Sequence, residues 1–191
     1  MPGRGEEGAQ HLTGRVSALL GAPVFVVHRL DQATSGLMLM ALDEATQRTL
    51  NRAFAERQVD KRYTAVVDGW MSDDEGCIDL PLAADWPNRP RQRVSHDAGK
   101  PSRTRWRVLD RTTASRSPTL RQTRLVLEPI TGRSHQLRVH LAAIGHPIVG
   151  DALYAAPADA PLARLMLHAS ALGLRHPVDG RALNFSSPVP F

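Results

Sequence analysis

Short runs of apolar residues, separated by polar turns, follow one another along most of the chain. Residues 24–27 and 37–42 form the first two runs and predict brief buried strands. Residues 61–69 alternate between side-chain types and end in glycine, which predicts a longer strand. The same signals predict strands at 78–82, 121–128, 165–174 and 183–185, and a hairpin made by 94–96 and 102–109.

Two segments in the first third of the chain have helical spacing instead. Residues 11–20 predict a short helix that ends at a glycine. Residues 44–56 predict a second helix, with Asp43 as its N-cap. Leu50 and Phe54 lie one turn apart on this helix, so we expect them on its inner face.

A third helix is predicted over residues 134–145, with Ser134 as its N-cap. Leu137 and Leu141 share one face of this helix because they are four residues apart. Arg138 lies on another face near the start of the helix. We therefore expect Arg138 to point away from the core, into a cleft.

The order of these elements is not a regular alternation of strands and helices. It predicts an α+β fold with a mostly antiparallel sheet. A chain of 191 residues is expected to form one domain. No apolar run reaches the ~18 residues of a membrane span, and the N-terminus lacks the apolar core of a signal peptide. With Cys77 as the single cysteine, a cytoplasmic protein without disulfides is expected.

The charge of the chain is unbalanced, with 24 Lys and Arg against 19 Asp and Glu. Only Lys61 and Lys100 are lysines, so almost all of the positive charge is arginine. Arginine suits phosphate forks and base stacking, which favours a polyanionic partner. A GC-rich genome would produce the same arginine excess without such a partner.

The first two apolar runs enclose a dense polar segment, residues 28–36. Arg29 favours the ionised form of the Asp31 carboxylate. An ionised, positioned aspartate can act as a nucleophile, a general base or a metal ligand. Gly36 allows a sharp turn or a close approach of two backbones. An ordinary strand–turn–strand with Asp31 as a capping residue explains the same residues.

Residues 84–93 predict a loop with kinks at two prolines. Trp86 offers a stacking surface, and Arg89, Arg91 and Arg93 supply positive charge. This composition is typical of a nucleic-acid-binding loop. A packed tryptophan in an arginine-rich surface turn is the alternative.

The strand 102–109 predicts a second basic surface. Side chains alternate between the two faces of a strand, so the arginines share one face while Trp106 and its neighbours pack on the other. The basic face consists of Arg103, Arg105 and Arg107.

Four histidines are candidate metal ligands, but their spacings match no standard zinc pattern. We expect them to be hydrogen-bonded structural residues. They are His135, His140, His146 and His168.

Three segments resemble the motifs of the RluA family of RNA pseudouridine synthases, in the order in which the family carries them. Residues 28–36 read His-Arg-Leu-Asp-x-x-Thr-Ser-Gly. Residues 61–69 resemble Lys-x-Tyr-x-Ala-x-Val-x-Gly, and residues 132–138 resemble Gly-Arg-x-His-Gln-Leu-Arg. The resemblance implies the pseudouridine synthase fold, a mixed and largely antiparallel sheet with flanking helices and a central cleft. It covers nearly all of residues 1–191 as one catalytic domain, without a separate RNA-binding domain.

The resemblance also departs from the family at the start of the chain. Family members usually carry an earlier strand with a Lys-Pro-x-Gly element, and this chain begins Met-Pro-Gly-Arg instead. Either the start is truncated or one edge of the sheet is missing.

The resemblance implies roles for individual residues. Asp31 corresponds to the catalytic aspartate, and Tyr63 to the tyrosine that lies against the target base and could help to remove the proton on carbon five. Arg138 corresponds to the arginine that pairs with the aspartate, with Arg133 as the second choice. Arg29 would fill space or contact RNA after the base has flipped. The expected RNA contacts also include Trp86, Arg89, Arg91, Arg93, Arg103, Arg133 and His135.

The implied reaction converts specific uridines to pseudouridine without a metal or a cofactor. The resemblance suggests 23S rRNA and the tRNA anticodon stem-loop as substrates. Flipping a base is least costly in loops, which favours stem-loops. The protein is expected to act as a monomer. A non-catalytic RNA-binding protein and an RNA N-glycosidase, which would release free uracil, are the alternatives.

Overall fold

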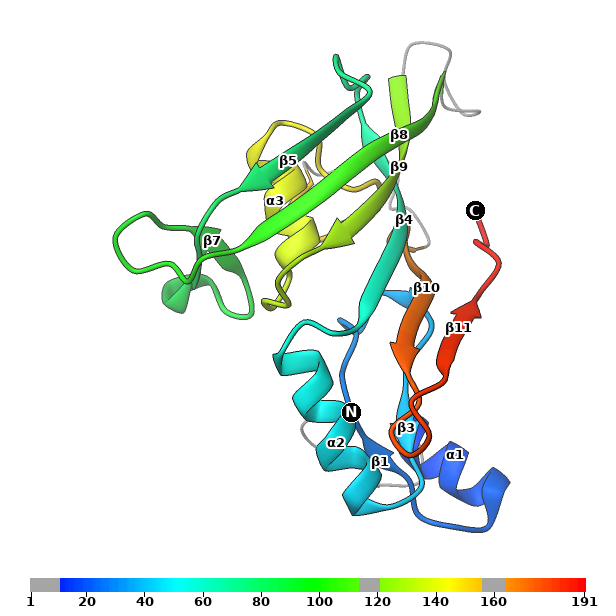
Figure 1. The fold of residues 1–191 in the computed structure, drawn as a ribbon. Helices are drawn as coiled ribbons and strands as arrows, with labels where there is room; N and C mark the ends of the chain where they lie inside the picture. Colours follow the sequence, from blue (N-terminus) through cyan, green and yellow to red (C-terminus); the bar gives the residue numbers. More distant parts are fainter. Residues whose placement is uncertain (1–10, 114–120, 156–163) are drawn as a thin grey trace.

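The computed structural model describes residues 11–113, 121–155 and 164–191 (Figure 1). The helices are α1 (Leu12–Leu20), α2 (Glu44–Ala55) and α3 (Gln136–Ala143), with a 3₁₀ turn, η2, at Trp86–Asn88. The strands are β1 (Phe25–Val26), β2 (Ser35–Gly36), β3 (Met40–Ala41), β4 (Asp60–Asp68), β5 (Glu75–Asp79), β6 (Leu82–Ala84), β7 (Gln92–Val94), β8 (Arg103–Thr113), β9 (Arg121–Pro129), β10 (Leu167–Arg175) and β11 (Ala182–Ser186). The expectation about the start of the chain concerns residues 1–10, which lie outside the described residues.

A seven-stranded sheet organises the fold. Its order is β11-β10-β4-β9-β8-β5, and β2 pairs with β10 beside this path. The β2–β10 pairing is parallel, and the other pairings of this sheet are antiparallel. The predicted α+β fold with a mixed, mostly antiparallel sheet is confirmed. Two smaller sheets, β1–β3 and β6–β7, lie beside the large one.

The predicted hairpin between 94–96 and 102–109 is wrong. β7 pairs with β6, whereas β8 pairs with β5 on one edge and β9 on the other. The residues after β7 lie against the segment between β5 and β6, where the Ser95 N–H donates to the Pro81 carbonyl at 2.9 Å. The local turn signal could not identify the partner, because pairing with β5 and β9 is what buries Trp106.

Two further details of the strands follow from single residues. The predicted strand at 78–82 is divided into β5 and β6, because Pro81 between them has no N–H to offer a ladder. The predicted alternation in β8 is confirmed. Thr104 and Trp106 are buried, and the three arginines between and beside them are exposed.

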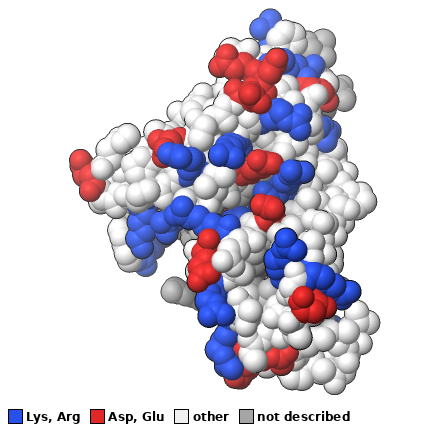
Figure 2. Space-filling view, in the orientation of Figure 1, with Lys and Arg blue, Asp and Glu red and all other residues white. Residues whose placement is uncertain are grey.

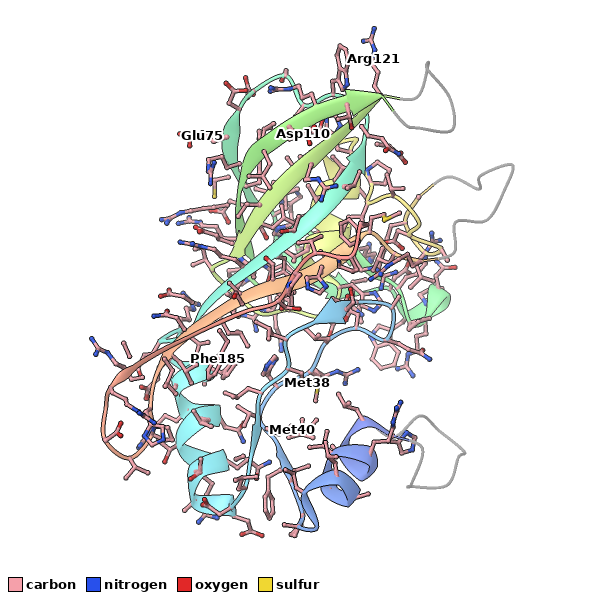
Figure 3. The ribbon with its side chains drawn as sticks, turned by 90° about the vertical axis from the view of Figure 1, so that its right-hand side faces the viewer. Met38, Met40, Glu75, Asp110, Arg121 and Phe185 are labelled. Atoms are coloured by element: carbon pink, nitrogen blue, oxygen red, sulfur yellow. The ribbon has the colours of Figure 1, made fainter. Side chains whose placement is uncertain are left out.

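Two clusters of buried side chains lie along the large sheet. The larger cluster lies between the sheet and α3 and includes Leu125, Leu127, Leu137, Leu141 and Leu167. The smaller cluster packs under α2 and includes Val27, Leu50, Val59, Leu172 and Leu174. Figure 3 shows the length of the sheet, with Glu75, Asp110 and Arg121 at one end and Met38, Met40 and Phe185 toward the other.

Strand β10 contributes to both clusters because it contains a bulge. Its register against β4 shifts between Ala169 and Ala171. One extra residue reverses the alternation of side chains along a strand. Leu167 before the bulge and Leu172 after it therefore face the same side of the sheet, although they are an odd number of residues apart.

Helix α2 was predicted correctly from its cap and its spacing. The Asp43 Oδ1 accepts a hydrogen bond from the Thr46 N–H at 2.8 Å. Leu50 is buried, and Phe54 packs against the smaller cluster. α1 ends at Gly21, which adopts the left-handed conformation with φ 66°. Within the described ranges, no helix has the length and apolar character needed to cross a bilayer.

Candidate active site

A pocket of about 480 Å³ lies where the two clusters of buried side chains meet. Its walls come from the segment after β1, the end of α2, strand β4 and the segment 129–138 that leads into α3. Among the described residues that line it, Asp31 is the single carboxylate. The cationic side chains around it are Arg29, Arg57, Lys61, Arg133 and Arg138. The expected central cleft is therefore present.

The loop that carries Asp31 is fixed at its first end by His28. The His28 Nε2 accepts a hydrogen bond from the Leu39 N–H at 3.0 Å. The imidazole also stacks on the Phe54 ring, with the ring centroids 4.7 Å apart. Burial, followed by the positive charge of Lys61, lowers the pKa of His28 to about 4. The ring is therefore neutral at pH 7 and can keep its role as acceptor.

The other end of the loop is fixed against β10. The Ser35 hydroxyl lies 2.9 Å from the His168 Nδ1, and the Arg164 Nη2 donates to the same hydroxyl. Gly36 has φ 111°, and a Cβ at this position would stand 2.3 Å from the Ala169 carbonyl oxygen. The close approach predicted for Gly36 is confirmed. Between these two anchored ends, Asp31 projects into the pocket.

Two side chains from the start of α3 face the Asp31 carboxylate. The Arg138 Nη1 lies 3.6 Å from the Asp31 Oδ2. The His135 Nε2 lies 3.9 Å from the Asp31 Oδ1. The Asp31 side chain keeps 23% of its surface exposed, so a ligand in the pocket can reach it. Arg133 lines the same pocket, but its Nε donates to the Pro101 carbonyl at 3.4 Å.

Arg138 is buried and makes its strongest contacts with Asp151, not with Asp31. Its Nε and Nη2 donate to the two carboxylate oxygens of Asp151 at 2.7 Å and 2.6 Å. Burial lowers the pKa of the Arg138 guanidinium, but the Asp151 and then the Asp31 carboxylate outweigh it and hold this pKa above its ordinary value. The expectation that Arg138 is free to point into the cleft is therefore wrong in part, since only its Nη1 faces Asp31.

The predicted cap of α3 is also wrong. The N-cap position is His135, with φ 53°, and no side chain caps the helix there. The Gln136 amide holds the preceding turn instead. Its Oε1 accepts from the Thr131 hydroxyl at 2.7 Å and from the Arg133 N–H at 3.0 Å. The start of α3 is therefore held by the buried Gln136 amide, and the predicted cap residue, Ser134, is exposed.

Tyr63 enters the pocket from β4, where it pairs with Leu127 of β9 and Ala169 of β10. Burial, with a smaller contribution from the Asp31 carboxylate, raises the pKa of Tyr63 to about 12. The phenol therefore carries its proton at neutral pH and can act as a hydrogen-bond donor and an aromatic surface.

The basic loop lies on the arm formed by β6 and β7. Trp86 is 68% exposed, and the Arg89 guanidinium lies 3.4 Å from the centre of its ring. The alternative of a packed Trp86 is therefore wrong. Figure 2 shows Lys and Arg side chains running from this arm across the middle of the molecule toward α2. Arg91 and Arg93 are exposed on the arm, whereas Arg103 is paired with Asp79 at 3.0 Å.

The histidines other than His135 have the structural hydrogen bonds that were expected. His140 contacts the Thr104 hydroxyl and the Leu80 carbonyl. His146 contacts the Asp68 carbonyl, and His168 contacts two serine hydroxyls. Within the described part of the chain, no three His, Cys, Asp or Glu side chains are grouped as metal ligands would be.

Two residues of the site, Asp151 and Tyr154, were missed by the sequence analysis. Both lie in the turn after the short apolar run that includes Ile148 and Val149. The signal available was weak: Asp151 comes two residues after Val149, the end of the apolar run, and an aspartate is almost never fully buried unless it is paired.

Comparison with known proteins assigns a class to this fold and site. A family model described as RNA pseudouridylate synthase matches residues 8–143. The solved structure of human RNA Pseudouridylate Synthase Domain Containing 1 superposes with a TM-score of 0.82 at 30% identity, covering 94% of this chain and 74% of the other. Human RNA Pseudouridylate Synthase Domain Containing 4 gives a TM-score of 0.73 at 27% identity, covering 94% and 77%. The chain belongs to the RNA pseudouridine synthase family.

Within this class, the chain is similar to proteins named dual-specificity RNA pseudouridine synthase RluA. The Escherichia coli (strain K12) protein is 49% identical over 166 residues, covering 86% of this chain and 73% of that protein. The Yersinia pestis protein is 46% identical over 192 residues, covering 100% and 90%. The chain is an RNA pseudouridine synthase, an isomerase of uridine in RNA, which decides against the non-catalytic and N-glycosidase alternatives.

Proposed function

We propose that Asp31 is the catalytic carboxylate of this synthase and that its substrates are RNA stem-loops. The observation that carries this proposal is the setting of Asp31, which is the single carboxylate among the described residues around a basic pocket. Its nearest cation, Arg138, is buried and held in place by Asp151. A pocket of about 480 Å³ lies in the range of about 300–1,000 Å³ that small-molecule sites occupy, which suits one flipped nucleoside.

The reaction makes and breaks bonds at two carbons. The bond from N1 of uracil to C1′ of the ribose breaks, the uracil turns, and C5 forms a new bond to C1′. The proton on C5 is then lost, and N1 gains one, so the product is an isomer of the substrate. A carboxylate beside the reacting nucleoside can act as nucleophile or base, and the Arg138 Nη1, 3.6 Å from the Asp31 Oδ2, can orient it.

Tyr63 supports the base in this proposal. An unstacked base is commonly held on an aromatic side chain, and Tyr63 lines the same pocket as Asp31. Because the pKa of Tyr63 is raised to about 12, its phenol is a neutral platform and hydrogen-bond donor, not a phenolate base. Arg29 is exposed and lines the pocket. It can contact the RNA at the position that the flipped base has left.

The arm supports the choice of stem-loops. Exposed arginines bind phosphates without reading sequence, whereas Trp86 can stack only on bases that are splayed out. Flipping a nucleotide costs a few kcal/mol in a duplex and less in a loop. The dual-specificity name of the relatives supports two RNA substrates, and we assign these as a loop of 23S rRNA and the anticodon stem-loop of tRNA. The enzyme acts as a monomer in the cytoplasm, without a metal or a cofactor.

The test uses short RNAs that carry tritium at carbon five of uridine. Wild-type protein is expected to release tritium from a 23S rRNA stem-loop and from a tRNA anticodon stem-loop, and much less from a matched perfect duplex. Asp31→Asn is expected to bind both stem-loops and to release none. Asp110→Asn, which removes an exposed carboxylate at the far end of the sheet (Figure 3), serves as the control with normal release.

Near-normal release by Asp31→Asn would show that Asp31 is not the catalytic group. Release from the duplex at the rate of the stem-loops would overturn the substrate assignment. Release from only one of the two stem-loops would overturn the dual specificity and leave the role of Asp31 intact.

A further inference from the structure

Tyr154 connects the arm to the active site through its hydroxyl group. The Tyr154 oxygen lies 2.8 Å from the backbone nitrogen of Gln92, the first residue of β7. The same oxygen lies 2.7 Å from the His135 Nδ1. A backbone N–H can only donate, so the hydroxyl accepts from Gln92. The hydroxyl keeps one proton to donate. Among the described residues, the His135 Nδ1 is the one acceptor within hydrogen-bond distance of it, so we assign the proton to an O–H···Nδ1 bond.

This assignment of the phenolic proton implies one tautomer for His135. Burial lowers the pKa of His135, although the Asp31 and Asp151 carboxylates oppose this effect while Arg138 and Arg29 add to it. The ring is therefore neutral at pH 7 and above, and a neutral imidazole carries one proton. Because Nδ1 accepts from Tyr154, the proton lies on Nε2, the nitrogen that faces Asp31 at 3.9 Å.

The Nε2–Asp31 distance is longer than a hydrogen bond in the free protein. Such distances often shorten when the substrate binds, so the Nε2–H is placed to donate to Asp31 in the complex. His135 is held in an unusual backbone conformation to do this, with φ 53° at a non-glycine residue. Left-handed conformations of this kind persist where the surroundings fix them and are common at functional sites.

The Tyr154 ring is fixed between the arm and the site. The Arg138 guanidinium lies 5.1 Å from the ring centre, and the Arg91 guanidinium of the arm lies 5.7 Å from it. The His135 ring meets it edge to face at 5.7 Å and 85°. The Tyr154 N–H donates to the buried Asp151 carboxylate at 3.2 Å. A displacement of the arm would therefore move the group that orients His135.

We propose that Tyr154 is a positioning residue of this synthase. Its hydroxyl ties the arm at Gln92 to His135 and fixes His135 as the Nε2–H tautomer that faces Asp31. This inference rests on the proposed catalytic role of Asp31. The arm then has a second role besides binding RNA. Through Tyr154, the position of the arm sets the orientation of His135 relative to the Asp31 carboxylate.

The tautomer can be read directly from long-range ¹H–¹⁵N spectra of the histidine rings in the full chain at pH 7.5. Two other histidines supply references within the same protein. His140 must carry its proton on Nε2, which meets the Leu80 carbonyl, and His146 must carry it on Nδ1, which meets the Asp68 carbonyl. We expect the His135 pattern to match His140. A pattern that matches His146 would overturn the proposal without any reference to activity.

Tyr154→Phe removes only the hydroxyl and keeps the aromatic ring. We expect His135 in this variant to lose its single tautomer and to show averaged ring nitrogens, while His140 and His146 keep theirs. The single-turnover rate on a stem-loop is expected to fall about tenfold, which is less than the roughly 100-fold that a 1 Å misplacement in an active site can cost. The Kd for the same RNA is expected to change less than about threefold.

An unchanged tautomer and an unchanged rate in Tyr154→Phe would refute the positioning role. An equal loss in rate and in RNA affinity would mean that Tyr154 contributes to RNA binding alone, which would also refute the positioning role. If the variant does not fold, the wild-type spectrum still decides. Normal turnover by Asp31→Asn would instead remove the proposed function and leave the tautomer result standing, so the two failures are distinguishable.

Discussion

Arg138 and Asp151 hold each other by two charge-assisted hydrogen bonds of 2.7 Å and 2.6 Å inside the protein. Both side chains are almost fully buried. The Asp151 Oδ1 also accepts from the Leu153 N–H at 2.9 Å, so the carboxylate is itself fixed by the turn that follows it. Arg138 is consequently a rigid cation whose remaining nitrogen, Nη1, faces Asp31.

Arg138→Lys is expected to lower the single-turnover rate about 10- to 100-fold. Lysine offers a point charge without a planar fork, so it cannot bind Asp151 with two nitrogens and face Asp31 with a third. A loss of this size is about 1.4–2.7 kcal/mol, roughly the value of one hydrogen bond to a charged group, about 1.5–3 kcal/mol. Arg133→Lys is the matched control, since Arg133 is exposed, and should change the rate less than about threefold. The opposite ranking would reassign the pairing role to Arg133.

Asp151→Asn is expected to destabilise the protein by about 3–5 kcal/mol, because it leaves a buried guanidinium without its counter-charge. The free energy of unfolding in urea measures this loss. Asp79→Asn is the comparison variant. It breaks the Arg103–Asp79 ion pair, in which both side chains are more than half exposed. It should cost much less, because solvent screens an exposed ion pair. Equal losses in the two variants would mean that the buried pair stabilises the fold no more than the exposed one.

Trp86→Ala is expected to weaken binding of a stem-loop more than binding of a matched duplex, because only splayed bases can stack on the indole. Its stability should change by no more than about 0.5 kcal/mol, since Trp86 is 68% exposed. Trp106→Ala is the control: this tryptophan is 8% exposed and its loss should cost about 3–5 kcal/mol. A lower melting temperature with unchanged affinities in Trp86→Ala would remove Trp86 from the RNA-binding surface.

The arginines of the arm are expected to contribute a salt-dependent affinity. Each phosphate contact releases counterions, with a slope of about 0.7–0.9 in log–log form. Arg91→Ala should lower the slope by about 1 and weaken all RNAs alike. A salt series with the stem-loop and the duplex measures both effects. An unchanged slope would mean that Arg91 meets no phosphate.

Acidification should destabilise the protein in part through His28. Its pKa is about 4 in the folded protein, against about 6.5 in the unfolded chain. Between these two values the unfolded state binds a proton that the folded state does not, so the stability present above pH 6.5 is lost as the pH falls toward 4. The slope due to this group can reach about 1.4 kcal/mol per pH unit.

His28→Gln keeps an acceptor for the Leu39 N–H and does not titrate, so it should reduce this slope. His96→Gln, at an exposed histidine, is the comparison variant and should leave the slope as it is. Urea unfolding at a series of pH values from 7.5 to 4 measures both. An identical slope in wild type and His28→Gln would show that burial of this ring does not control the acid sensitivity.

The sequence alone determined the elements whose signals are local. The cap at Asp43, the spacing of Leu50 and Phe54, and the alternation in β4, β8 and β9 all depend on neighbours within a few residues. The motif 28–36 also pointed to Asp31, because its polar groups between two apolar runs are unusual. Sequence could place Arg138 near the start of a helix by spacing, and the family resemblance linked it to the aspartate.

Only the tertiary structure decided which distant groups meet. The partner of β7 is β6 and not β8, because β8 buries Trp106 by pairing with β9, which follows it, and with β5, which precedes it by two other strands. The strongest partner of Arg138 is Asp151, thirteen residues later, since the turn after α3 brings a buried carboxylate under the guanidinium. The link from Gln92 through Tyr154 to His135 joins three segments that no local pattern connects. Capping and periodicity are properties of neighbouring residues, whereas a buried ion pair or a hydroxyl bridge exists only when the chain has folded.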